Sequence, residues 1–336
     1  MMPVMLAALA LAAVQAPAPA RTAAPAVAPG AHLVVITGLG GEAAYRAALA
    51  EWGSALERAG RTLGIPSDRI VRLVGDTAGM SRAGGSRRAT RENVVAVLGD
   101  VAGRSSRGDL VFIFLAGHGS HEGPESRLNL PGPDITAAEL GKLLNELPGR
   151  RLAVVNASSA SGDFVAALSA PGRVIITATK TSLERNATQF GGHFVAAYAA
   201  DGADADKDGR VSLLEAFLYA KRETARAYTA DNRLLTEHAM LDDDGDQQGS
   251  AAPGAEGADG ALSRTIFLGA APAAVAAGDA RGAELLAEKR GLEERIAALR
   301  GRKPSMPPED YESQLEALLV DLALTNEALR ARGGSR

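Results

Sequence analysis

The stretch Asp109–Ser120, which reads DLVFIFLAGHGS, decides how this chain folds. Residues 110–116 are all apolar and make a run long enough for a strand that is buried on both faces. The run ends in Gly117-His118-Gly119, so an imidazole lies where the strand meets the next loop. Runs of this kind that alternate with helical spacing predict an α/β fold, a mostly parallel sheet sandwiched by helices.

Further strands and helices are predicted from apolar runs and from helical spacing of apolar residues, respectively. We expect strands at 32–37, 69–74, 152–155 and 173–178, and a final short strand at 265–268 that pairs at the sheet edge. Helices are expected at 42–61, 90–102 and 136–147. The α/β domain predicted in this way spans 31–270.

The N-terminal residues predict export. Residues 1–20 contain an apolar run followed by small residues, as in a cleaved signal peptide, and 21–30 is a Pro- and Ala-rich stretch typical of a disordered linker. A secreted or periplasmic protein is expected, without a transmembrane segment. The chain has no cysteine, so neither a disulfide nor a lipid anchor on cysteine is available.

Composition argues against nucleic acid as a partner. The net charge is −4, aromatic residues make up 4% of the chain, and no long basic run with interleaved aromatics occurs.

A second strand end carries the other half of a recognisable pattern. The apolar run 152–155 leads into 156–162, which reads NASSASG. A strand ending in His-Gly, followed by a strand ending in small-x-Ser-Gly, resembles the active-site layout of the caspase and legumain class of peptidases, the caspase-haemoglobinase fold of clan CD. The resemblance covers about 32–268 and includes the stretches 178–188 and 235–246.

The resemblance implies roles for particular residues. His118 matches the general base, and Ser159 stands where the family has its cysteine nucleophile. Candidates for the substrate mouth are Gly119, His121, Glu184 and Arg185. A nearby imidazole and a helix N-terminus stabilise a thiolate, but a hydroxyl gains far less and needs an oriented base. The sequence offers no obvious third member of a triad.

Three functions remain open at this stage. The first is a catalytically inactive pseudopeptidase that binds a protein or peptide partner. The second is a hydrolase, a peptidase or acyl hydrolase, with Ser159 as nucleophile and His118 as base. The third is a structural envelope protein that forms oligomers through its C-terminal residues.

Residues 204–215, DADKDGRVSLLE, fit the twelve positions of an EF-hand calcium loop. The alternating carboxylates converge on one ion, Gly209 permits the sharp turn, and the last glutamate binds through both oxygens. The predicted ligands are Asp204, Asp206, Asp208, the Arg210 carbonyl and Glu215.

A second alternating acidic run contains Asp242, Asp244 and Asp246. Its glycine is misplaced for an EF-hand, and no matching glutamate follows. The run could complete the first site, hold a second ion or form a solvated turn.

The C-terminal residues 281–332 predict a coiled-coil-like helical hairpin. Apolar residues recur at heptad-like spacing on both sides of a proline-containing turn. They are Leu285, Leu292, Ile296 and Leu299 before the turn, and Tyr311, Leu315, Leu318, Leu322 and Leu329 after it. The hairpin packs on its own domain or pairs with a partner chain, including a second copy.

Overall fold

The structure, a computed structural model, describes residues 30–76, 86–106, 108–147, 151–200, 202–206, 209–254, 259–269, part of 281–299 and 306–333. The strands are β1 Ala31–Thr37, β2 Ile70–Val74, β3 Arg87–Arg88, β4 Leu110–Ala116, β5 Gly119–Glu122, β6 Glu125–Leu128, β7 Ile135–Thr136, β8 Arg151–Asn156, β9 Arg173–Thr177 and β10 Met240–Asp242. The α-helices are α1 Ala43–Thr62, α2 Arg91–Arg104, α3 Ala137–Asn145, α4 Phe164–Leu168, α5 Phe190–Ala196, α6 Leu213–Ala230 and α8 Pro308–Gly333. Short 3₁₀ turns lie at Ser67–Arg69, Ala197–Ala199 and Ser263–Thr265. The predicted signal peptide and the linker up to residue 29 lie outside the described residues.

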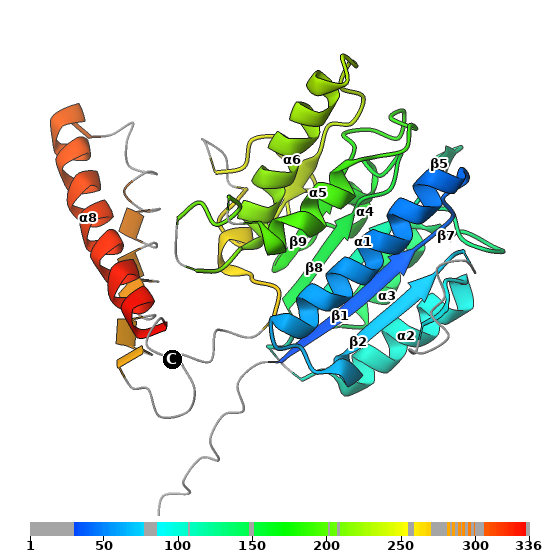
Figure 1. Cartoon of the computed structure of the whole chain (residues 1–336), viewed down its shortest axis with the longest axis horizontal. Coiled ribbons are helices and arrows are strands. Elements are labelled where there is room, and N and C mark those ends of the chain that lie inside the picture. The colour runs from blue at the N-terminus through cyan, green and yellow to red at the C-terminus, as the bar shows by residue number, and fades with distance from the viewer. Residues whose placement is uncertain are drawn as a thin grey trace, which may run out of the picture.

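A seven-stranded sheet of order β10-β9-β8-β4-β1-β2-β3 forms the centre of the α/β domain (Figure 1). Its pairings are parallel except that of β10 with β9. A small antiparallel sheet, β5-β6-β7, lies between β4 and α3 in the chain and was not expected from the sequence. The α/β class with a mostly parallel sheet is confirmed.

Helices cover both faces of the large sheet, and alternation along each strand supplies both cores. On β4, Phe112 and Phe114 join the core cluster that includes residues of α1, α5 and α6. Val111, Ile113 and Leu115 join the opposite cluster, with residues of α2, α3 and α4. Burying each such side chain contributes about 1.5–3 kcal/mol relative to exposure.

Local capping explains where several helices begin. Thr90 Oγ1 accepts a hydrogen bond from Asn93 N at 3.3 Å before α2. Thr136 Oγ1 accepts one from Glu139 N at 3.1 Å before α3. Such caps satisfy backbone N–H groups that the first helical turn leaves without partners.

The edge strand predicted at 265–268 is wrong. Residues Ser263–Thr265 form a 3₁₀ turn, and Phe267 makes only an isolated antiparallel bridge, with Ser212. The sheet edge beside β9 is taken by β10, with Leu241 opposite Ile176. An apolar run as short as 265–268 does not specify which backbone it pairs with, because that choice depends on long-range packing.

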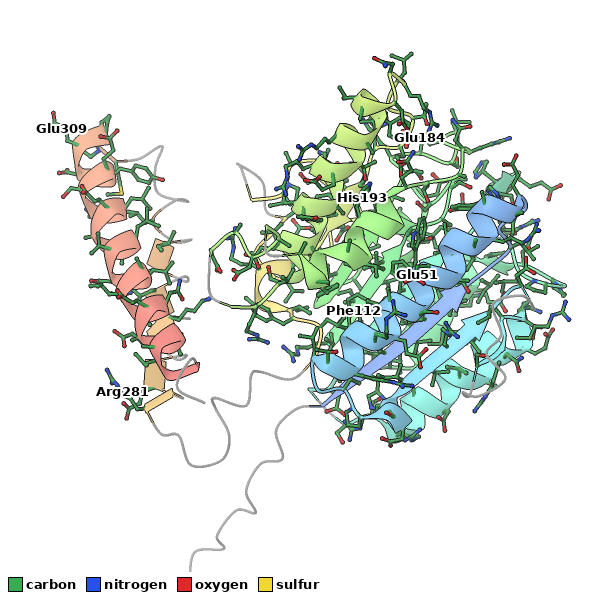
Figure 2. All side chains as sticks on the ribbon, in the orientation of Figure 1. Glu51, Phe112, Glu184, His193, Arg281 and Glu309 are labelled. Atoms are coloured by element: carbon green, nitrogen blue, oxygen red, sulfur yellow. The ribbon has the colours of Figure 1, made fainter. Side chains whose placement is uncertain are left out.

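The described residues of 281–299 are helical and lie beside α8, apart from the sheet (Figure 1). Arg281 lies at the start of the first segment and Glu309 near the start of α8. The two residues lie at opposite ends of the pair (Figure 2), so the segments run antiparallel. The four predicted apolar residues before the turn are buried, with exposed fractions from 1% at Leu292 to 6% at Ile296. Neither core cluster of the sheet includes a residue beyond Leu268.

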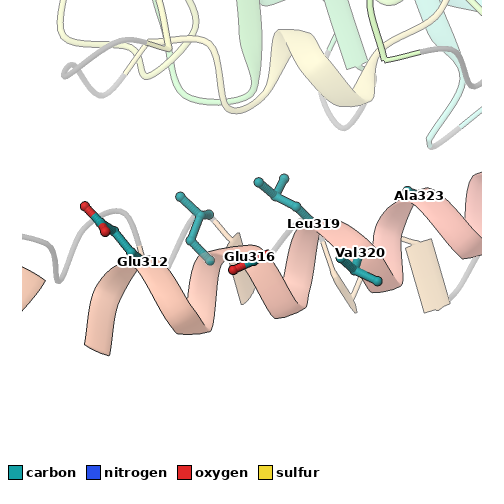
Figure 3. Close-up of a pocket in the computed structure, with 6 residues that line it drawn as sticks. Glu312, Glu316, Leu319, Val320 and Ala323 are labelled. Carbon is teal, nitrogen blue, oxygen red and sulfur yellow. The ribbon is translucent and has the colours of Figure 1, made fainter. Parts of the chain in front are cut away.

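Another face of α8 is open and apolar. It carries a shallow groove of about 380 Å³ whose lining comes from α8 alone, with Leu319, Val320 and Ala323 along it (Figure 3). Leu319 and Val320 are 44% and 51% exposed. Among the described residues, no helix has the length and hydropathy needed to cross a bilayer.

Candidate functional site

His118 and Ser159 follow two strands that are neighbours in the large sheet. β4 and β8 pair in parallel, with Leu115 opposite Asn156, so both strands end at the same edge. The backbone N–H of His118 donates to Leu39 O at 2.8 Å, which fixes the turn after β4. In open parallel sheets this edge is where ligands bind.

The hydroxyl of Ser159 is buried and already engaged. The residue is 0% exposed, and its Oγ accepts a hydrogen bond from the backbone N–H of Gly119 at 3.1 Å. A Cβ on Gly119 would lie 2.2 Å from Ser159 O, so the close approach of the two backbones requires glycine. An N–H donor cannot take the proton from a hydroxyl, and this contact therefore does not activate Ser159.

The ring of His118 lies against α1. Its centroid is 5.1 Å from that of Tyr45, and in the described part of the chain no hydrogen bond joins this imidazole to Ser159. Tyr45 Oη lies 3.4 Å from Gly117 O and 3.2 Å from Thr188 Oγ1. Burial raises the pKa of Tyr45 to about 12, so the phenol stays protonated at neutral pH.

The neighbouring serines are also hydrogen-bonded. Ser158, directly before Ser159, donates its hydroxyl to Asn156 Oδ1 at 2.6 Å. Ser161 Oγ lies 3.1 Å from Thr179 Oγ1, which also accepts from Ser161 N at 2.8 Å. Ala160, between these serines, has φ of +50°, a conformation that is uncommon for a residue with a side chain. The loop is thus held in one conformation by its own polar groups.

The helix after Ser159 is short and does not begin directly after this residue. α4 starts at Phe164 and has five residues. The dipole effect of a helix falls off beyond its first turn, so α4 offers little stabilisation to an anion at position 159.

Glu184 and Arg185, both predicted at the substrate mouth, make contacts within their own surroundings. Glu184 O accepts from Ala160 N at 2.8 Å, and its carboxylate lies 2.8 Å from His238 Nδ1. Arg185 Nε donates to Ser182 O at 3.5 Å. The Glu184–His238 pair therefore ties the 235–246 stretch to the loop that carries Ser159.

Glu237 is a buried acidic residue that holds the start of α5. Its buried carboxylate accepts hydrogen bonds from Gln189 N at 2.8 Å and Phe190 N at 3.0 Å, at the start of α5. Burial raises the pKa of Glu237, and the bonds from the two backbone N–H groups oppose that rise.

His121 belongs to a polar cluster that the sequence did not predict. Its Nδ1 lies 3.1 Å from Asp163 Oδ2 and 3.0 Å from Ser126 Oγ, and Ser126 Oγ donates to the same Asp163 oxygen at 2.7 Å. Both partners thus meet one ring nitrogen, which differs from a triad, where the serine faces Nε2 and the carboxylate faces Nδ1.

The structure brings three carboxylates of the predicted calcium loop together. Ligand oxygens of Asp204, Asp206 and Glu215 all lie within 4.8 Å of one another. Gly209 has φ of +83°, and its N–H donates to Asp204 Oδ2 at 2.9 Å, as the sharp turn of the loop requires. Asp208, a predicted ligand, lies outside the described residues.

Glu215 organises the end of this loop. One carboxylate oxygen accepts from Ala205 N and Asp206 N, at 2.9 and 3.3 Å, and the other accepts from Ser212 N at 2.9 Å. Burial raises the pKa of Glu215, and the charge of Asp206 adds to that rise. A divalent cation would offset both effects.

Arg210, whose carbonyl is a predicted calcium ligand, lies with its guanidinium over the Phe267 ring, 3.6 Å from the centroid. Leu213 N donates to Ile266 O at 2.8 Å. Segment 266–267 therefore supports the calcium loop instead of the sheet edge.

The structure divides the second acidic run. Asp242 and Asp244 lie with Asp259 in one group whose ligand oxygens are within 4.8 Å of one another. Asp246 accepts from Gln248 N at 2.7 Å and is not in that group.

Sequence reasoning missed Asp163, Glu237, Asp259 and Lys289. Asp163 directly follows Ser161-Gly162, and Glu237 lies in a stretch quoted for the family resemblance, so both had a local signal. Asp259 is far from the acidic run in sequence, and Lys289 belongs to the predicted hairpin. Only the fold brings these two to their partners.

Comparisons with known proteins do not identify a family. No family model matches the chain, and no curated protein matches it. Among solved structures, the chain is similar to the protein GSU0716 from Geobacter sulfurreducens, with 13% identity and a TM-score of 0.40, over 64% of this chain and 93% of that one.

Proposed function

We propose that this chain is an exported, calcium-binding pseudopeptidase, built on a scaffold like that of caspases and legumains, which acts by binding a protein or peptide partner. The strand order that brings His118 and Ser159 to one sheet edge supports this proposal. So does the sequence, which has no cysteine to supply the family's nucleophile. Export rests on residues 1–20, which have the pattern of a signal peptide.

One observation carries the loss of catalysis. Ser159 Oγ is buried and accepts the Gly119 N–H, and no base contacts this hydroxyl within the described residues. A serine nucleophile needs a base at its hydroxyl and a carboxylate that orients the base. The hydroxyl here accepts a hydrogen bond from the backbone of a partly buried residue, which is a structural task.

Calcium would be held by Asp204, Asp206 and Glu215, with Asp208 and the Arg210 carbonyl as further predicted ligands. Hard oxygen donors at alternate positions suit this cation. Because the chain has no disulfide, the ion would act as a staple between the loop and α6.

The surface for the partner would be the sheet edge around His118 or the C-terminal helices. The exposed apolar residues Leu319, Val320 and Leu324 on α8 support the second surface. A second copy of the chain is one partner that fits such a helical face.

The deciding experiment is active-site labelling of the full chain with a fluorophosphonate probe, in calcium, followed by mass spectrometry. We expect no adduct on Ser159, and Ser159→Ala serves as the blank. An adduct on Ser159 that disappears in His118→Ala would overturn the proposal in favour of a serine hydrolase.

A further inference from the structure

A second group of carboxylates lies where β10 ends. Asp242 closes β10, Asp244 follows it, and Asp259 comes from a segment that returns to this point. One ligand oxygen of each lies within 4.8 Å of the others, which is the spacing of ligands around a single ion.

Burial distinguishes this group from an ordinary acidic surface. Asp242 is 0% exposed and Asp259 is 8% exposed. Asp242 Oδ1 accepts from Gly245 N at 3.2 Å, but among the described residues Oδ2 is buried with no hydrogen-bond partner. The hydroxyl of Ser169 also interacts with the Asp242 carboxyl group. A buried carboxylate oxygen without a donor is costly unless a cation contacts it.

The rest of the segment fixes the geometry of the group. Asp243 N donates to Asp259 Oδ1 at 2.9 Å, and the Asp243 carboxylate accepts from Gly260 N and Ser263 N, at 2.8 and 2.6 Å. Asp243 therefore holds the 259–263 turn against the end of β10. The carboxylates of Asp242, Asp244 and Asp259 lie together beside it.

Among the residues that the structure describes, no basic side chain pairs with this group. In the part of the chain that the structure describes, none of Asp242, Asp244 and Asp259 forms an ion pair with Lys, Arg or His. Asp244 is exposed, so the group is open to solvent on one side, where water could complete a coordination shell.

We propose that Asp242, Asp244 and Asp259 bind a second Ca²⁺, separate from the ion of the 204–215 loop. The donors are all carboxylate oxygens, which favour hard cations over zinc or copper. The ion would join the edge strand β10 to the 259–263 turn, so that two distant segments are stapled at a place where the chain has no disulfide.

The experiment is a calcium titration of the full chain by isothermal calorimetry after removal of bound metal with EDTA. We expect two ions for each wild-type chain. Asp244→Asn, at an exposed position that does not endanger folding, and Asp242→Asn should each leave one ion. Asp246→Asn is the matched control, because this carboxylate lies in the same loop but outside the group, and it should retain two.

This test distinguishes failure of the proposed second site from failure of the proposed site in the 204–215 loop. Glu215→Gln removes the ion of the 204–215 loop and should leave the second one in place. A stoichiometry unchanged by Asp244→Asn and Asp242→Asn overturns the second site, whatever Glu215→Gln does. Loss of an ion in Asp246→Asn, with none lost in Asp244→Asn, also overturns the ligand set.

Discussion

Lys289 Nζ lies 3.6 Å from Asp206 Oδ2, so an ammonium group of the C-terminal helical segment faces a carboxylate of the predicted calcium loop. The Lys289 side chain is 6% exposed and that of Asp206 is 38% exposed. With Ca²⁺ bound as proposed, the ammonium group and the ion would compete for the same carboxylate, which would couple the two parts of the chain.

Removing this ammonium group should tighten calcium binding. Two unit charges about 4 Å apart interact by about 1 kcal/mol in water, so Lys289→Gln should lower the calcium Kd of the 204–215 loop about fivefold. Calorimetric titration in Asp244→Asn, where this loop would hold the only ion, measures the effect. Arg281→Gln, in the same segment, should leave the Kd unchanged, and an unchanged or weaker Kd in Lys289→Gln would contradict the competition.

Calcium should raise the thermal stability of the folded chain. A ligand at about one hundred times its Kd stabilises the native state by roughly 2.7 kcal/mol. Chelation with EDTA is therefore expected to lower Tm, and to lower it less in Glu215→Gln, which has lost the ion of the loop. Differential scanning calorimetry checks this, and equal Tm values with and without EDTA in the wild type would refute a stabilising ion.

Ser159→Ala should destabilise the fold without removing an activity. The substitution removes the acceptor of the partly buried Gly119 N–H, at a cost of about 1 kcal/mol. Urea unfolding followed by circular dichroism measures the loss. The control is Ser67→Ala, at an exposed position, where a change within about 0.5 kcal/mol is expected. Equal stability of the two variants would show that the Ser159 hydroxyl has no structural role.

Stability should fall as the pH drops below about 6.5, the unperturbed pKa of histidine. Burial lowers the pKa of His32, with a further contribution from Arg69, and burial also lowers that of His193. A histidine whose pKa is lower in the folded state than in the unfolded state binds protons more readily when the chain is unfolded. Acid therefore favours the unfolded state, and stability falls as the pH drops below the unfolded-state pKa. The slope from each group is at most about 1.4 kcal/mol per pH unit.

Urea unfolding at pH 7.5 and 5.5 tests this dependence. His32→Gln should show a smaller difference between the two values than the wild type. Ser67→Ala is the comparison, because it changes an exposed residue without a titratable side chain, and it should retain the wild-type difference. An identical pH dependence in His32→Gln and the wild type would mean that His32 does not couple to folding.

A chain that ends at residue 270 should fold without the C-terminal helices. Both core clusters are complete by Leu268, so the truncation removes no core side chain of the sheet domain. A cooperative thermal transition and native circular dichroism are the expected results for residues 31–270. An aggregated or non-cooperative fragment would show that the helical segments belong to the domain core.

Much of the sheet could be predicted because its information is local. The stretches 33–36 and 110–116 are continuously apolar, and short runs of this kind between turn residues are typical of strands buried on both faces. The 204–215 loop is contiguous in sequence, so its carboxylate spacing and Gly209 already define the turn that the structure contains.

The strand at 265–268 and the ligand Asp246 show where this reasoning ends. Both predictions were based on short sequence patterns that are compatible with several partners. The actual partner depends on which segment, distant in sequence, packs beside them. In the structure β10 lies at the sheet edge, and the acidic group contains Asp259 instead of Asp246.

The sequence by itself determined the α/β class, the positions of His118 and Ser159 at strand ends, the absence of a thiol and the form of the calcium loop. Each of these depends on residue type and near-neighbour spacing. Only the tertiary structure decided that Gly119 N–H meets the Ser159 hydroxyl, that Asp259 joins Asp242, and that Lys289 faces Asp206. These contacts join residues that are 40, 17 and 83 positions apart in the sequence, and their geometry is set by how the layers pack and not by any local pattern.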